Sequence, residues 1–149
     1  MPTSPQPGCA RRFDAAVATL ARPADLRSLP LPAVHLMLGL RLCAMCEAAG
    51  SDAVAELTQR YRNVAAALAV VELSREIARV WPEPFVVGRP CRTAMSPDEA
   101  TVADLVRAAA HADRHRFGRA IAGFVRAERH ECLFAATVVA VAALQPKAG

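Results

Sequence analysis

The stretch that decides the fold is Ser51–Val80, SDAVAELTQRYRNVAAALAVVELSREIARV, which lies in the longest part of the chain without glycine or proline. Its apolar residues recur at spacings of three and four, the pattern of one face of an α-helix. The residues of this face are Val54, Leu57, Tyr61, Val64, Leu68 and Val71. We therefore expect one long central helix over about residues 52–80, capped by Ser51, on which the other helices pack. At about 1.5 Å per residue it would measure roughly 45 Å and cross the whole domain.

Shorter helices are predicted on both sides of this central helix by the same periodicity. They cover about residues 10–21, 32–49, 96–112 and 132–144, with a further helix beginning near Asp113. Gly50 stops the second helix directly before the central one, which predicts an antiparallel pair. Ser96, Pro97 and Glu99 have the sequence of a capping box. The pattern leaves open whether residues 113–144 make one bent helix or two.

These patterns predict an all-α fold, a single-domain bundle of five or six helices around the central helix, with no sheet. The composition agrees, because 54% of the 149 residues are hydrophobic and only 5% are aromatic, which suits closely packed helices rich in alanine. The domain is expected to cover residues 9–145. It would lie between a flexible N-terminal tail, 1–8, and a C-terminal tail, 146–149.

The chain shows no secretory signal and no run of apolar residues long enough to span a bilayer. Its longest apolar run, Cys132–Leu144, has 13 residues, whereas a spanning helix needs about 20. The first residues contain prolines and polar side chains rather than an apolar core. We therefore expect a cytoplasmic protein without a membrane span, whose five cysteines are reduced thiols.

Two pairs of residues have the spacing of metal ligands. Cys43 and Cys46 form a CxxC, but they lie inside an apolar helix rather than at a helix N-terminus, and no second pair completes a zinc site. His111 and His115 are four residues apart, yet Ala112 stands where a zinc protease has its glutamate. We expect core packing for the cysteines, solvent exposure for the histidines, and no metal or cofactor. A thiol or metal-binding protein using Cys43 and Cys46 is the alternative.

Positive charge gathers in one part of this arginine-rich chain. The formal net charge is +4, and Lys147 is the sole lysine among 18 basic residues. Between residues 107 and 129 six arginines face only two acidic residues, and the candidate basic face consists of Arg116, Arg119, Arg126 and Arg129. A solvated helix face is the favoured interpretation. Nucleic-acid binding by the segment 107–129 is the alternative.

The irregular segment Trp81–Met95 is the candidate interaction loop. Three prolines forbid helix there, and the segment is unusually rich in large apolar residues for a loop. Its candidate contact residues are Trp81, Phe85, Arg89, Cys91, Arg92 and Met95. The competing interpretation is that these residues seal the end of the bundle, in which case Trp81 and Phe85 should be buried.

No catalytic constellation is recognisable in the sequence. It contains no Gly-x-Ser-x-Gly turn and no glycine-rich phosphate loop. We therefore expect a non-enzyme, an interaction or regulatory module whose partner is another protein or a second copy of the chain.

The run Arg89–Glu99, RPCRTAMSPDE, resembles a family of small, uncharacterised, all-helical bacterial proteins. In that family a Pro-Cys segment precedes a Met-Ser/Thr-x-Asp-Glu helix start, and the likeness extends from about Ala48 to Ala110. The resemblance implies a helical fold and a bacterial source. It implies no activity, because none is attached to the family.

Overall fold

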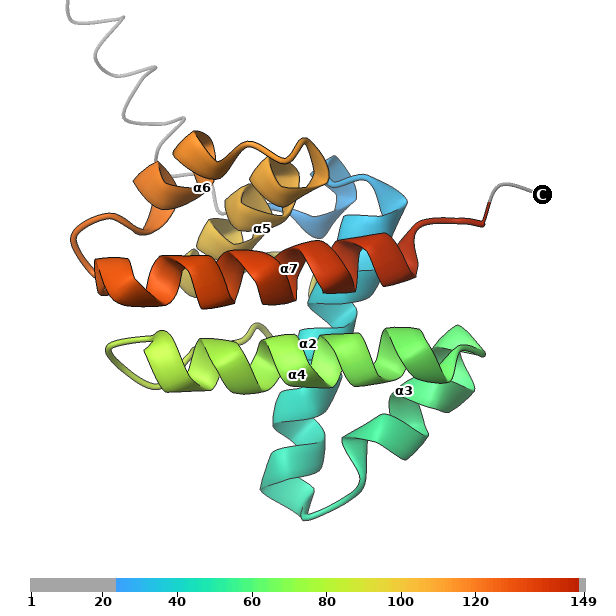
Figure 1. Cartoon of the computed structure of the whole chain (residues 1–149). Helices are drawn as coiled ribbons and strands as arrows, with labels where there is room; N and C mark the ends of the chain where they lie inside the picture. Colours follow the sequence, from blue (N-terminus) through green and yellow to red (C-terminus); the bar gives the residue numbers. More distant parts are fainter. Residues whose placement is uncertain (1–23, 148–149) are drawn as a thin grey trace, which may run out of the picture.

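The computed structural model describes residues 24–147, which fold into six α-helices and two short 3₁₀ turns (Figure 1). In chain order they are η1 (Leu26–Ser28), α2 (Leu31–Ala49), α3 (Ala53–Tyr61), α4 (Val64–Val80), α5 (Pro97–Ala110), α6 (Arg114–Ile121), η2 (Ala127–Arg129) and α7 (His130–Leu144). These residues contain no strand, only an isolated bridge between Asp25 and Ala94. The predicted all-α, single-domain bundle is confirmed. The predicted tail 1–8 and helix 10–21 lie outside the described residues, as do residues 148 and 149.

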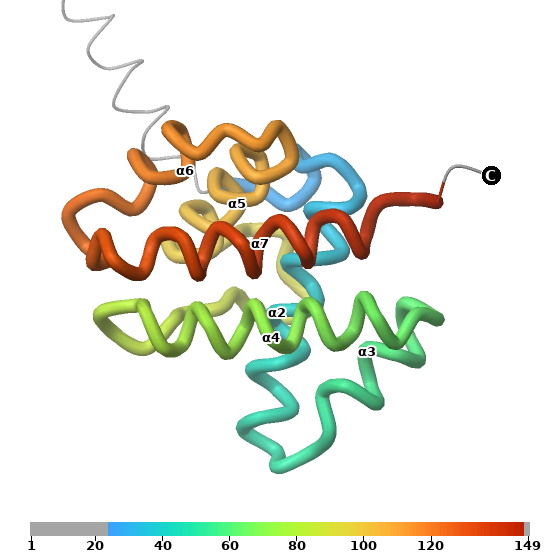
Figure 2. Tube along the Cα trace, in the orientation of Figure 1, coloured from blue at the N-terminus to red at the C-terminus, as the bar shows by residue number. Residues whose placement is uncertain are grey.

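The helices form a bundle in which the most extensive packing is between α4 and α7, which lie side by side (Figures 1 and 2). Helix α2 crosses behind this pair at a steep angle, and α5 and α6 cover the other side of α7. The core is filled by aliphatic side chains from every helix. The hydrophobic residues with no exposed surface are Leu36, Met37, Ala67, Val70, Ile121, Leu133 and Ala140.

The expected continuous helix over 52–80 is wrong, because the chain breaks at Arg62 and Asn63. Arg62 has a left-handed backbone with φ of 50°, and the Asn63 side chain accepts a hydrogen bond from the Ala66 N–H at 3.2 Å. This asparagine cap starts a new helix, so α3 folds back against α4. The break allows both α3 and α4 to bury apolar faces on the core, Leu57 from the first and Val70 from the second.

Most of the other helix ends predicted within the described residues are confirmed, with small shifts and one change of cap. The helix predicted over 96–112 is α5 (Pro97–Ala110), and the last helix begins at His130 rather than at Cys132. Gly50, with φ of 66°, ends α2, but Asp52 rather than Ser51 caps the next helix. Ser96 and Glu99 form the complete capping box of α5. The question left open for residues 113–144 is resolved as two helices, α6 capped by Asp113, and α7.

One fully buried ion pair ties the bundle together. Arg41 of α2 is 1% exposed, and its Nε and Nη2 donate to the two carboxylate oxygens of Glu99 at 2.6 and 3.0 Å. Its Nη1 donates to the carbonyls of Arg89 and Arg92, and Nη2 also donates to the carbonyl of Ala94. All five guanidinium donors are therefore used. The pair fixes α2 to the start of α5 and holds the irregular segment between α4 and α5 in place.

Helix α2 is the one described helix whose length and composition meet the requirement for crossing a membrane, and 44% of its most apolar stretch is buried in the fold. The charge it carries at Arg41 is matched by Glu99 within the protein. We therefore describe α2 as the core helix of the bundle, in agreement with the expectation of no membrane span.

Glycine at position 88 is required by this ion pair. A Cβ at Gly88 would lie 2.4 Å from Arg41 Nη2 and 3.0 Å from a Glu99 carboxylate oxygen. Neither group has room to move, because each is held by several hydrogen bonds. By contrast, a Cβ at Gly118 in α6 would meet only His130 Nδ1, at 3.8 Å.

We predict opposite effects for two glycine-to-alanine substitutions. Gly88→Ala should lower the free energy of unfolding by about 1–3 kcal/mol, because the added methyl group overpacks the ion pair. Gly118→Ala should raise it by about 0.5–1 kcal/mol, because alanine is the better helix former. Urea denaturation followed by circular dichroism measures both. Equal effects of the two substitutions would contradict the proposed crowding at Gly88.

The Glu99 carboxyl is a source of acid sensitivity. Burial is the largest influence and raises its pKa. Hydrogen bonds from Arg41 and from the backbone N–H groups of Ser96 and Gly88 outweigh burial, so the pKa lies below its ordinary value of 4.5. Because the pKa is lower in the folded state, the ionised carboxylate stabilises the fold above pH 4.5. This stabilisation is lost as the pH falls through and below that value.

We predict that Glu99→Gln lowers the free energy of unfolding by about 3 kcal/mol near pH 7, because Arg41 is left buried without its counter-charge. The difference between the wild type and the variant should shrink as the pH is lowered from about 5 to about 3. Urea denaturation at a series of pH values gives both free energies. A difference that stays constant down to the lowest pH would show that the carboxylate charge is not what stabilises the pair.

Candidate functional site: an apolar groove with basic banks

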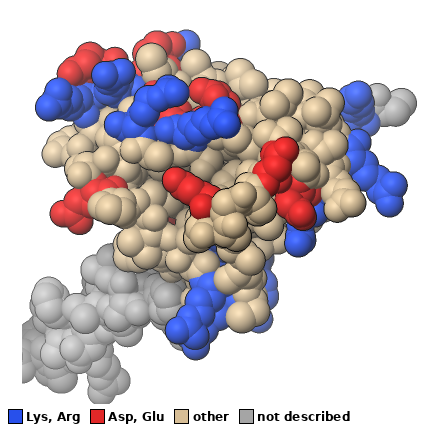
Figure 3. All heavy atoms as spheres, turned by 90° about the horizontal axis from the view of Figure 1, so that it is seen from below, with Lys and Arg blue, Asp and Glu red and all other residues tan. Residues whose placement is uncertain are grey.

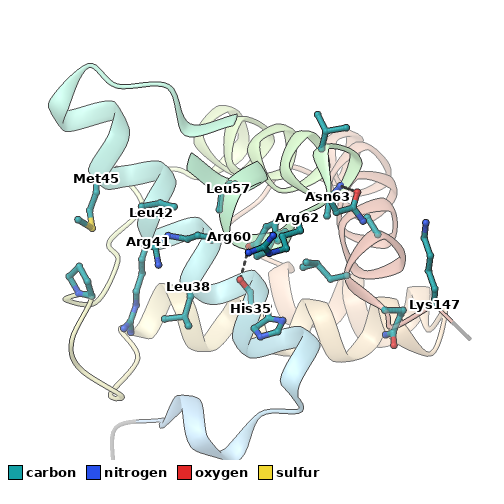
Figure 4. Close-up of a pocket in the computed structure, with 18 residues that line it drawn as sticks. His35, Leu38, Arg41, Leu42, Met45, Leu57, Arg60, Arg62, Asn63 and Lys147 are labelled. Atoms are coloured by element: carbon teal, nitrogen blue, oxygen red, sulfur yellow. Dashed lines mark hydrogen bonds between the residues drawn. The ribbon is translucent and has the colours of Figure 1, made fainter. Parts of the chain in front are cut away.

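An open groove of about 1040 Å³ lies beside α2 (Figure 4). Helix α2 forms its floor, and the α3–α4 joint and the segment after α7 form one bank. Pro90, from the irregular segment, borders the other side. Figure 4 shows Met45 near one end of the groove and Lys147 at the other.

The floor of the groove is apolar and open to solvent. Leu38 and Met45 project from α2 and are 41% and 48% exposed. The groove continues past Leu38 and Pro90 into a furrow of about 410 Å³ lined by Leu31 and Val34. Contiguous exposed apolar surface of this kind is a candidate for interaction.

The α2–α3 crossing sets the shape of the floor. A Cβ at Gly39 would lie 2.2 Å from Tyr61 Oη and 2.9 Å from Val70 Cγ1, so only glycine permits α2 to approach so closely. Tyr61 Oη donates to the backbone carbonyl of His35 at 2.8 Å and joins the end of α3 to α2. These contacts fix the bank relative to the floor.

The charge on the banks is positive. Arg60, Arg62 and Lys147 line the groove, and no Asp or Glu is among the described residues lining the groove or the furrow. None of the three forms an ion pair within residues 24–147. In the furrow Arg92 is likewise unpaired, whereas Arg27 is bound by Asp25.

The distribution of charge differs between margins of the molecule. Figure 3 views the molecule from below. Acidic and basic side chains alternate along the upper edge of that view, whereas the charged side chains on the part that projects at the bottom centre are all basic. Ion pairs on α4 join Arg75 to Glu72 and Arg79 to Glu76. Within the described residues, by contrast, the cations of the groove have no acidic partner.

Arg62 occupies a position where glycine would be less strained. Its φ of 50° is shared in the described chain by one other non-glycine residue, Ala112 with φ of 52°. Left-handed backbone costs an ordinary residue about 1 kcal/mol or more. Arg62 is the C-cap of α3, a position where left-handed backbone is common, and its side chain lines the groove.

We predict that Arg62→Gly and Ala112→Gly each raise the free energy of unfolding by up to about 1 kcal/mol, because glycine adopts this backbone without strain. Thermal and urea denaturation measure the change. A loss of stability in Arg62→Gly alone would mean that the arginine side chain itself stabilises the fold.

The candidate interaction loop, Trp81–Met95, contains both buried and exposed residues. Trp81 and Met95 are buried, and Trp81 packs edge-on against Phe85 and Phe124 with ring centroids 5.3 and 5.2 Å away. Phe85 is half-buried. The burial of Trp81 favours the sealing interpretation, whereas Phe85, which that interpretation expected to be buried, is only partly so. Of the six candidate contact residues, Arg89, Cys91 and Arg92 are exposed, and the backbone carbonyls of both arginines accept hydrogen bonds from Arg41. Val86, in the same segment, is also exposed.

The candidate basic face lies on α6 and on the connection that follows it. All four of its arginines are exposed and form no ion pair with the described residues: Arg116, Arg119, Arg126 and Arg129. Their neighbour Arg114 is engaged, because it pairs with Glu131 and lies 4.4 Å from the centre of the Phe134 ring. The basic face is an exposed surface, whereas the groove is a concave site.

The cysteine and histidine pairs do not form a metal centre within residues 24–147, where no group of three or more metal-ligating side chains occurs. Cys43 and Cys46 are buried, and burial raises the pKa of the Cys43 thiol to about 11, against a smaller opposite effect of Ser74. Such a thiol is a poor nucleophile at neutral pH. His111 is the C-cap residue of α5, whereas His115 lies in the first turn of α6, so the two do not share one helix face.

The groove itself was missed by the sequence predictions. Two signals were present: Asn63, a helix-capping residue directly before Val64, and the seven-residue spacing of Leu31, Leu38 and Met45. The basic bank depends on the helix break at Arg62, which the apolar periodicity alone conceals.

Comparison with known proteins adds no relative: no family model, no curated protein and no solved structure matches the chain. The resemblance to small bacterial helical proteins stays a prediction.

Proposed function

We propose that this protein is a non-catalytic interaction module that binds an acidic, apolar-rich segment of a partner protein in the α2 groove. One observation supports the proposal most directly. A solvent-open groove with an apolar floor is bordered by Arg60, Arg62 and Lys147, and no carboxylate lines it among the described residues. Complementary charge selects the partner, and apolar contact supplies affinity.

A protein segment fits this groove better than a nucleic acid. Nucleic-acid sites follow the phosphate backbone with a continuous row of cations and stack bases on aromatic rings. Here α2 contributes mainly apolar side chains such as Leu38 and Met45, beside His35 and Arg41, and Tyr61 is the one Phe, Tyr or Trp among the described lining residues. Apolar side chains from a protein are the natural complement of that floor.

The proposal moves the interaction surface away from the loop Trp81–Met95. Burial of Trp81 and Met95 supports their role in sealing the bundle, whereas the exposure of Leu38 and Met45 supports docking on α2. The cytoplasm remains the proposed location, in keeping with the free thiols of the described cysteines.

Nucleic-acid binding by the basic face is the second candidate function. The four exposed, unpaired arginines Arg116, Arg119, Arg126 and Arg129 favour it. It predicts salt-sensitive binding of nonspecific DNA or RNA that is independent of the groove.

Site-specific photocrosslinking in the source cell tests the proposed function. A photoreactive amino acid at Met45, in the groove, should crosslink a partner peptide with an excess of Asp and Glu and with several apolar residues. The same amino acid at Ala135, exposed on α7, is the matched control position. Arg60→Glu combined with Arg62→Glu should reduce the Met45 crosslink about tenfold, which corresponds to about 1.4 kcal/mol of binding free energy.

The control for charge is Arg116→Glu combined with Arg119→Glu, which changes the net charge equally on α6. This control should leave the Met45 crosslink intact. An equal loss in both double variants, or crosslinked peptides that are basic, would reject the groove as an acidic-segment site.

A further inference from the structure

Three exposed apolar residues lie in a row along α2. Leu31, Leu38 and Met45 are 65%, 41% and 48% exposed. They are spaced seven residues apart, which is close to two helical turns, so they form a nearly straight line along the helix surface. Val34 and Leu42 lie beside this line and are half-buried. We call the row of Leu31, Leu38 and Met45 the α2 stripe. The α2 stripe runs along both the furrow and the groove.

We infer that the bound partner segment is an α-helix that packs lengthwise on the α2 stripe through heptad-spaced apolar residues. This inference rests on the proposed function of the groove. A seven-residue repeat of exposed apolar side chains is what one helix presents to another in two-stranded packing. From Leu31 to Met45 the stripe measures about 21 Å, the length of a partner helix of about 14 residues.

Extended partners fit the stripe less well. A β-strand places same-side residues about 6.6 Å apart, whereas residues of the stripe are about 10.5 Å apart. Strand addition also requires an open sheet edge, and the described chain contains no strand. A polyproline segment requires a row of aromatic side chains, and the groove offers Tyr61 alone, whose hydroxyl is bound to the carbonyl of His35.

The charge beside the stripe selects the partner helix. Arg60, Arg62 and Lys147 line the groove half, and Arg92 lines the furrow half. In paired helices these flanking places correspond to the positions where opposite charges set partner choice. A partner with Glu or Asp beside its apolar row is therefore favoured. A second copy packed stripe to stripe is disfavoured, because the flanking cations of both copies would meet.

A designed peptide provides the test. It has three heptads with Leu at the first and fourth positions and Glu at the two flanking positions, so that its own acidic charge opposes self-pairing. A matched peptide carries one proline at a central outward position, which keeps the charge and the leucines but forbids the helix. A third peptide has Lys in place of Glu. Fluorescence anisotropy with the full chain measures binding, and circular dichroism measures the helicity gained.

The helical acidic peptide should bind at least about tenfold more tightly than the proline and lysine peptides, with a gain in helicity on binding. Leu38→Glu in the protein should weaken binding about tenfold. Met45→Glu is a second groove variant, in case the first lowers stability. Val139→Glu on α7 replaces a side chain that is 58% exposed and should leave binding unchanged.

The outcomes separate this inference from the proposed function. Equal binding of the proline and helical peptides, with an acidic partner segment crosslinked at Met45, would overturn the helix and leave the acidic-segment site intact. Absence of both peptide binding and the Met45 crosslink would overturn both. Binding of phosphatidylglycerol vesicles that Leu38→Glu abolishes, without peptide binding, would show that the α2 stripe contacts a membrane surface instead.

Discussion

The buried guanidinium of Arg41 is the constraint on which the rest of the structure depends. A fully buried charged side chain is tolerated only when it is paired with an opposite charge and when each of its hydrogen-bond donors has an acceptor. Glu99 supplies the counter-charge, and the carbonyls of Arg89, Arg92 and Ala94 accept the remaining donors. One side chain of α2 thereby orders the start of α5 and an irregular segment that has no regular secondary structure of its own.

This constraint gives the faces of α2 different roles. Leu36, Met37 and Leu40 face the core, and Arg41 fixes the segment before α5. The row of Leu31, Leu38 and Met45 remains uncovered by the described residues. The helix break at Arg62 ends α3 beside the groove, so that Arg60 and Arg62 lie on the bank of the groove. The candidate site is thus a consequence of how α2 is anchored and of where the next helix ends.

The sequence was sufficient for the helical class, because local signals carry most of that information. The Gly50 stop and the Ser96 capping box were predicted and are observed. The continuous helix 52–80 was wrong, because its apolar periodicity runs through Arg62 and Asn63 without interruption. The site was not predictable, since a groove is defined by the mutual position of α2, α3 and the chain after α7. The pairing of Arg41 with Glu99 joins residues 58 positions apart and leaves no local signal.

Amide hydrogen exchange on the double variant Arg41→Met/Glu99→Gln tests most directly whether Arg41 holds the segment before α5. The variant removes both charges, so no uncompensated charge is left in the core. We expect faster exchange of the Leu26 and Met95 amides, which bond to Thr93 and Ala24 across this segment, while α4 and α7 keep their protection. Unchanged exchange at Leu26 and Met95 would contradict the role assigned to Arg41.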